Sequence, residues 1–224
     1  LCRTLPSPHR RWGFPSDIET IGRLVGDLRP VRRTRPPLLD ALLWISAVAA
    51  IALVLLPRVN FGALAARLGA APDMWMALAG SLVTMVLAAI ATFMLGLPDR
   101  DPRWALAPLP GLALWLGASG LGCLRAGLEA FGPIPTHEII DCFAFIVGFS
   151  VPLSALMFVL RRRAYSLRPT LNAAIAGLAA SAAAASLLTL VHPFDATVLD
   201  LGVHFIAVGV VVVSNGIAAR RCAT

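Results

Sequence analysis

The stretch that decides the fold is "LLDALLWISAVAAIALVLLP", residues 38 to 57, in which Asp40 is the single charged residue. Twenty residues of helix rise about 30 Å, which matches the hydrocarbon thickness of a bilayer. The apolar residues run continuously and do not alternate with polar ones, so they predict a helix and not a strand of a membrane barrel. The stretch therefore predicts a membrane-spanning helix.

Five later stretches of 20 to 24 residues are also nearly free of charge. They cover residues 74–97, 105–124, 139–160, 170–191 and 199–219. The whole chain is 58% hydrophobic and 14% charged, far from the usage of a soluble domain. We predict an all-α integral membrane protein with a six-helix transmembrane domain over 38–219, a short cytoplasmic N-terminal amphipathic segment within 1–37, and a cytoplasmic tail over 220–224.

The arginines predict which side of the membrane each loop faces. Residues 1–37 hold eight of them, the loops at 98–104 and 161–169 hold two and four, and the tail holds two, whereas the alternate loops hold only Arg58, Arg67 and Arg125. Cytoplasmic loops of membrane proteins are enriched in basic residues, so both termini are predicted to be cytoplasmic. The net charge of +7 is then explained by topology, and no direct contact with nucleic acid is predicted.

The segment "SDIETIGRLVGDLR", residues 16–29, is predicted to form a short amphipathic helix. Ser16 and Glu19 have the spacing of a capping box. An apolar stripe follows at helical spacing, formed by Ile18, Ile21, Val25 and Leu28. Two interpretations remain open from these residues: the helix lies on the inner membrane surface, or it docks a cytoplasmic partner. The basic stretch "RPVRRTRPP", residues 29–37, is typical of an anchor near anionic lipid.

The spans themselves indicate packing and not chemistry. No arginine or carboxylate lies at the middle of any span, although transporters and ion pumps usually need such groups to bind their cargo. "HEIID" at 137–141 lacks the second histidine of a zinc-protease HExxH motif, so no enzyme is predicted. A small membrane transporter and a scaffold subunit of a membrane complex are kept as alternative functions.

The predicted outer face gathers thiol, imidazole and carboxylate groups. The candidates for sensing or for binding a metal are Cys123, Cys142, His192, Asp195 and His204. Such groups together suit a divalent metal such as zinc, and the two cysteines would meet an oxidising compartment in a bacterium. The alternative is that the histidines and acids are interfacial helix caps and hydrogen-bond partners of one another. A divalent metal at this face is thus one open interpretation, and no other cofactor is predicted.

The chain resembles the NrsF-type integral-membrane anti-sigma factors of proteobacteria, from about residue 18 to 221. The resemblance rests on "IETIGRLVGDLRPVRRTRPP" before the first span, on "IIDCFAFIVGFSVPLSALMFVLRRRA" at 139–164, and on "LVHPFDATVLDLGVH" at 190–204. It implies a multi-pass protein of the bacterial inner membrane. Such a protein holds an extracytoplasmic-function sigma factor through its N-terminal segment and releases it on metal or oxidative stress.

The resemblance also implies roles for individual residues. Ile18, Ile21, Val25 and Leu28 would contact the sigma factor, supported by Arg29, Pro30, Arg32 and Arg33. Members of the family sense through two outer cysteines, of which Cys142 matches the first. His192 stands at the position of the second. Two arrangements remain open: a metal bound by Cys142, His192 and His204, or Cys123 as the replacement for the missing cysteine.

Overall fold

The computed structural model describes residues 17–26, 35–70, 72–126, 136–161, 167–191 and 198–223. The chain divides into two compact units, residues 1–34 and 35–224. In the first unit the described part is helix α1, Asp17–Gly26. Within the described ranges the second unit is built from helices, and no strand occurs there.

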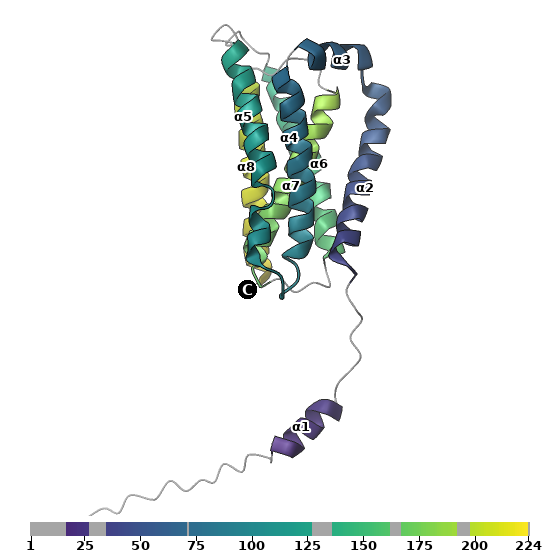
Figure 1. Ribbon diagram of the computed structural model, residues 1–224, viewed down its shortest axis with the longest axis vertical. Helices are drawn as coiled ribbons and strands as arrows, with labels where there is room; N and C mark the ends of the chain where they lie inside the picture. The colour runs from purple at the N-terminus through teal and green to yellow at the C-terminus, as the bar shows by residue number, and fades with distance from the viewer. Residues whose placement is uncertain are drawn as a thin grey trace, which may run out of the picture. The chain divides into compact units, whose positions relative to one another are not determined.

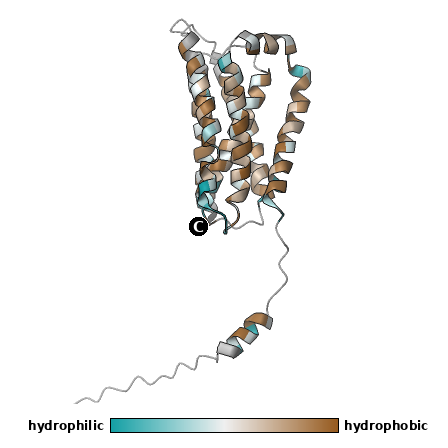
Figure 2. Cartoon of the chain, viewed as in Figure 1, coloured by the Kyte–Doolittle hydropathy of each residue, from teal (hydrophilic) through white to brown (hydrophobic). Residues whose placement is uncertain are grey.

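Six helices of the second unit are long and apolar enough to cross a membrane. They are α2 (Pro37–Leu55), α4 (Pro72–Met94), α5 (Leu109–Ala126), α6 (Thr136–Leu160), α7 (Pro169–Val191) and α8 (Val198–Ala223). Figure 1 shows them side by side as a bundle, and Figure 2 shows that their apolar residues cover most of their length. The predicted all-helical fold with six membrane-crossing helices is confirmed.

Helices α7 and α4 form the centre of the bundle. Within their apolar windows 67% of α7 and 50% of α4 is buried, compared with 17 to 22% for the other four spans. The buried part of α7 is an unbroken run of small residues from Ala179 to Ser186. Small side chains allow neighbouring helices to approach closely on every side of α7. This explains why the most alanine-rich helix of the chain is also the most enclosed.

Helices α4 and α5 approach one another closely at two glycines. A Cβ atom on Gly80 would lie 2.5 Å from the backbone nitrogen of Trp115, and one on Gly111 would lie 2.7 Å from that of Thr84. Gly177 plays the same part between α7 and α8, where a Cβ atom would lie 3.0 Å from the Cα of Val212. These helix pairs are therefore held at distances that only glycine permits.

Replacing Gly80 with alanine is expected to lower the free energy of unfolding by about 1–3 kcal/mol, because the added methyl group meets backbone that cannot move aside alone. Gly117→Ala in α5 is the matched control, since its Cβ atom would meet nothing within 4 Å. It should leave stability unchanged or raise it by up to about 1 kcal/mol through helix propensity. Denaturation of both variants in mixed micelles measures the difference, and equal effects would contradict the close α4–α5 contact.

The bundle differs from the sequence-based description in its connections. Residues 58–73 were expected to be a loop, but they contain helix α3 (Phe61–Ala70), and the short 3-10 helix η1 (Leu56–Arg58) ends the preceding span. Helix α3 lies across the end of the bundle between α2 and α4 (Figure 1). A second 3-10 helix, η2 (Pro102–Leu106), precedes α5. Residues 220–223 of the expected tail continue α8.

Candidate functional site

Helix α1 presents an apolar face that nothing within its own length covers. Ile21 and Val25 of the predicted stripe are each more than half exposed, and so is Leu24. At about 100° per residue, Leu24 lies on the same side of the helix as Ile21 and Val25. Leu24 was not part of the predicted stripe, although its angle on the helical wheel places it there.

The opposite side of α1 is polar. Arg23 donates a hydrogen bond from Nη2 to Glu19 Oε1 over 3.2 Å, one helical turn away. Both side chains are mostly exposed, so this ion pair contributes only about 0.3–0.5 kcal/mol. Its place on the helix marks the face that remains in water when the apolar face is covered.

The structure does not describe the side chains of the other residues predicted to contact or support a sigma factor. Ile18 belongs to α1, but its side chain is not among those described. Five others lie outside the described residues: Leu28, Arg29, Pro30, Arg32 and Arg33. Their predicted roles therefore remain predictions.

Cys142 lies near the start of α6 and is buried. It packs in a cluster with Ile146 of the same helix, Ala184 and Leu188 of α7, and Ala207 of α8. The thiol therefore stands where three helices meet. A group that enlarges this thiol or draws it outward has to move α6 relative to α7 and α8, because the interior there is already filled.

His204 lies on the same end of α8 as this cluster and is half-buried. It precedes Ala207 by three residues, so both lie on one side of the helix, and Ala207 packs with Cys142. The other sensing candidates are not placed: His192 and Asp195 lie outside the described residues, and the side chain of Cys123 in α5 is not described. The metal arrangement and the Cys123 arrangement both stay predictions.

Among the described residues, no group of three or more histidines, cysteines, aspartates and glutamates lies close enough to hold a metal ion. The described residues do not include the segment between α7 and α8, which contains His192 and Asp195. The predicted divalent metal at this end therefore stays untested.

The opposite end of the bundle contains buried polar groups at the ends of three helices, α2, α6 and α7. Asp40 Oδ1, Arg161 Nε and both amide atoms of Asn172 are buried without a hydrogen-bond partner among the described residues. Burial lowers the pKa of Arg161 to about 10, which still leaves it charged at neutral pH. Each unsatisfied group costs about 1–3 kcal/mol. We therefore expect water or lipid headgroups to reach this end of the bundle.

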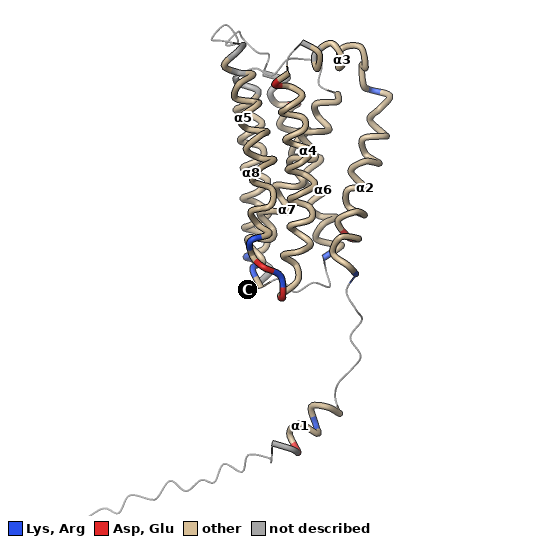
Figure 3. Tube along the Cα trace, viewed as in Figure 1, with Lys and Arg blue, Asp and Glu red and all other residues tan. Residues whose placement is uncertain are grey.

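The described charged residues of the second unit gather at the two ends of the bundle, and the described middle of the bundle is uncharged (Figure 3). At the end where α2 begins are Arg35, Arg100, Arg103, Arg161, Arg168, Arg220 and Arg221. At the other end the arginines are Arg58, Arg67 and Arg125. The asymmetry within the structure repeats the one in the sequence, and the end with most arginines is the one to which the N-terminal segment is joined.

Six apolar helices around a small-residue centre, together with an amphipathic helix in the first unit, define a multi-pass helical membrane protein with a short N-terminal amphipathic segment. The chain matches the family model described as negative regulator of sigma F (NrsF) over residues 24–223. It therefore belongs to the NrsF family. Membership implies a sigma factor as its partner and a regulatory role.

The family match begins within α1, at Leu24, so the earlier residues Ile18 and Ile21 precede it. The resemblance drawn from the sequence ran from about 18 to 221 and thus started one to two helical turns earlier. No curated protein and no solved structure matches the chain.

Proposed function

We propose that this protein is a membrane-bound anti-sigma factor that sequesters an extracytoplasmic-function sigma factor through its N-terminal segment. The observation that carries the proposal is the exposed apolar face of α1, with Ile21, Leu24 and Val25, in a chain that belongs to a family of negative regulators of sigma F. An amphipathic helix that lays its apolar face into a groove is a common mode of peptide recognition. Sequestration at the membrane keeps the bound factor away from RNA polymerase.

The basic residues after α1 support this role. Arg29, Arg32 and Arg33, together with Pro30, follow Leu28 of the apolar stripe within five residues. Guanidinium groups pair well with carboxylates, so an acidic patch on the sigma factor is the expected counterpart. The apolar face would supply most of the affinity and the arginines the orientation and the rate of association.

The distribution of arginines supports an orientation. The end of the bundle where α2 begins and α8 ends has most of the arginines of the second unit. By the positive-inside rule this end faces the cytoplasm, which places both termini on the side where sigma factors act. We therefore assign the protein to the bacterial inner membrane with α1 in the cytoplasm.

A binding measurement tests the assignment of the N-terminal segment. The full chain in lipid nanodiscs is compared with a variant that begins at Arg35, the first residue of the second unit, for binding of a purified sigma factor of this class. The full chain is expected to bind and the shortened one to lose binding at least a hundredfold. Equal binding by both would place the sigma-factor contact in the bundle and would overturn the assignment.

Release on metal or oxidative stress would begin at the buried thiol of Cys142. Helix α6 runs from this thiol to the opposite end of the bundle, and on the way the carbonyl of Leu153 accepts a hydrogen bond from Trp44 of α2. Helix α2 leads back to the sigma-binding segment. A displacement of α6 can thus reach α2 directly. A coupling of about 1.4 kcal/mol is enough to change sigma-factor affinity tenfold.

The sensing proposal predicts that Cys142→Ser abolishes the release of sigma factor by zinc or by an oxidant. If a metal is ligated by Cys142, His192 and His204, His192→Ala should abolish zinc-dependent release and leave the oxidant response intact. If Cys123 replaces the missing cysteine, Cys123→Ser should abolish the oxidant response instead. Release is measured as the dissociation constant of the sigma factor with and without each agent. Wild-type responses in all three variants would end the proposal.

A further inference from the structure

We propose that, in the absence of a sigma factor, the apolar face of α1 binds the anionic surface of the cytoplasmic leaflet, so that the bilayer and the sigma factor compete for one face. The competition rests on the proposed function, whereas the binding of α1 to the bilayer does not. The protein would then have a resting state in which the recognition helix is covered by lipid.

The shape of α1 suits a helix that lies in the plane of an interface. Ile21, Leu24 and Val25 are 57%, 65% and 58% exposed, and they span about 100° of the helix circumference. Glu19 and Arg23 form their ion pair on the other side. A short helix with one apolar and one charged side places its apolar side about 5–10 Å into the headgroup boundary and keeps its charges in water.

The charge that attracts anionic lipid comes from the residues on both sides of α1. Within the helix the charges of Glu19 and Arg23 cancel, Asp17 adds one negative charge, and Asp27 adds another directly after the helix. Before the helix lie Arg3, Arg10 and Arg11, and after it lie Arg29, Arg32, Arg33 and Arg35. Clusters of arginine close to a membrane are attracted to the negative surface potential of the cytoplasmic leaflet. Trp12 and Phe14 add aromatic side chains of the kind enriched at membrane interfaces.

The length of chain between the two units keeps α1 near the bilayer. Ten residues, 27 to 36, separate the end of α1 from Pro37, where α2 begins. Even fully extended they reach only about 36 Å. Tethering converts membrane binding into an intramolecular event with an effective concentration of lipid that is always high. A modest intrinsic affinity is then sufficient, and this favours the bilayer over a soluble occupant or a second copy of the chain.

Competition has a consequence that a purely protein-binding helix would not show. A sigma factor must displace α1 from the lipid before it can bind. Its apparent association constant is therefore the intrinsic constant multiplied by the fraction of chains whose helix is not docked. Each arginine near an anionic surface shifts that equilibrium about fivefold. Removing arginines that do not contact the sigma factor should therefore strengthen sigma-factor binding.

The docking is tested by the depth of spin labels on the full chain in nanodiscs. One label is placed at Leu24→Cys on the apolar face and a matched one at Glu19→Cys on the polar face, in a chain whose four native cysteines are serine. In discs with anionic lipid, the label at 24 is expected to be accessible to oxygen and protected from a water-soluble nickel chelate. The label at 19 is expected to be accessible to the nickel chelate and less accessible to oxygen. In zwitterionic discs the label at 24 should also be accessible to nickel, and the label at 19 should not change.

A label at 24 that stays accessible to nickel in anionic discs would overturn the proposal, whatever the sigma factor does. Dipolar broadening between labels in discs that hold two chains would assign the apolar face to a second copy and would also overturn it. If the label at 24 is protected but no sigma factor binds in either lipid, the docking stands and the proposed function fails. These outcomes separate the two proposals.

The competition is tested by sigma-factor affinity in the same discs. The affinity is expected to be higher in zwitterionic than in anionic discs, and adding sigma factor to anionic discs should remove the label at 24 from lipid while the label at 19 stays outside the lipid. The double variant Arg10→Gln, Arg11→Gln, outside the predicted sigma-contacting residues, should raise affinity in anionic discs by up to about 25-fold. It should leave affinity in zwitterionic discs unchanged. Equal affinity in both lipids for both chains would overturn the competition.

Discussion

Replacing Ile21 and Val25 together with aspartate is expected to weaken binding of the sigma factor at least a hundredfold. Both side chains are more than half exposed on the apolar face of α1, so their replacement removes no packing within the described part of the first unit. In a complex they would be enclosed, and a carboxylate buried there without a partner would lose its hydration. A hundredfold loss corresponds to about 2.7 kcal/mol, within the usual range for residues that anchor an interface.

Two features make this result decisive. The same substitutions weaken docking of α1 to lipid, which acts in the opposite direction on sigma-factor affinity, so competition with the bilayer cannot produce the loss. Gly22→Ala is the control on the same helix, since its Cβ atom would meet nothing within 4 Å and alanine favours the helix by about 1 kcal/mol. It should bind unchanged or up to about fivefold tighter. Titration of nanodisc-embedded chains gives the dissociation constants, and wild-type affinity of the double variant would exclude the apolar face from the contact.

The six spans could be predicted from the sequence because length and hydropathy decide whether a segment crosses a bilayer. Helix α3 could not be predicted in this way, since Phe61–Ala70 is too short to cross. Its signal is local and weak: Asn60 lies just before the helix, and its side-chain Oδ1 accepts a hydrogen bond from the backbone of Ala63 at 3.0 Å. Such a cap is visible in the sequence only when a helix is already expected there.

The interior of the bundle was less predictable than its span count. In α2 apolar residues occupy every side, so the sequence does not show which of them faces lipid and which faces protein. Trp44 proves to be fully buried, whereas Leu42 in the same helix is 60% exposed. In a soluble helix polarity would distinguish the two sides. In a bilayer both surroundings are apolar, and only the partner helices decide.

The candidate site shows the same limit. Cys142 was placed at the start of a span, but its packing among Ala184, Leu188 and Ala207 comes from helices far along the chain. Asn172 near the start of α7 is fully buried, and neither of its amide atoms has a hydrogen-bond partner among the residues that the structure describes; its spacing from other polar residues gives no sign of this. Proximity between distant helices depends on their rotation about their own axes. Hydropathy does not determine that rotation.

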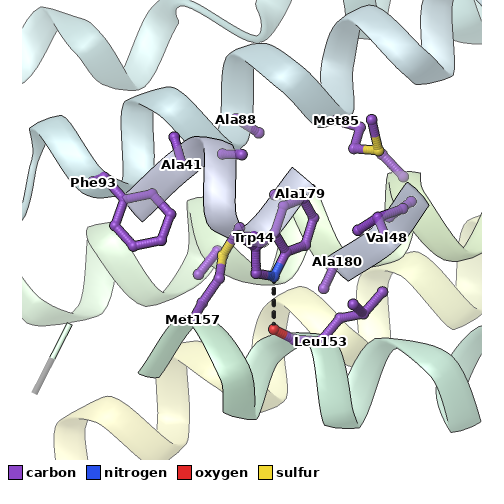
Figure 4. Close-up of a cluster of buried hydrophobic side chains, with 14 of the residues drawn as sticks. Ala41, Trp44, Val48, Met85, Ala88, Phe93, Leu153, Met157, Ala179 and Ala180 are labelled. Carbon is purple, nitrogen blue, oxygen red and sulfur yellow. Dashed lines mark hydrogen bonds between the residues drawn. The ribbon is translucent and has the colours of Figure 1, made fainter. Parts of the chain in front are cut away.

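Trp44→Ala is expected to lower the free energy of unfolding of the bundle by about 3–5 kcal/mol. The indole ring is fully buried among Met157 of α6, Ala179 and Ala180 of α7, and Val48 of its own helix (Figure 4). Its removal leaves a cavity that these side chains cannot fill, and α2 loses its largest buried side chain. Denaturation in mixed micelles measures the loss. Leu42→Ala on the lipid-facing side of α2 should change stability by less than about 1 kcal/mol.

The nitrogen of the same indole ring can be tested separately from its bulk. Trp44 Nε1 donates a hydrogen bond of 3.0 Å to the carbonyl of Leu153, one residue after Pro152 within α6. Trp44→Phe keeps most of the buried volume and removes this donor, and interhelical hydrogen bonds in membranes contribute about 0.6 kcal/mol on average. A small loss of stability is therefore expected. If α6 passes its displacement to α2 through this bond, Trp44→Phe should also reduce the change in sigma-factor affinity caused by modifying Cys142. A full response in a phenylalanine variant of near-normal stability would show that the signal reaches α2 by another contact.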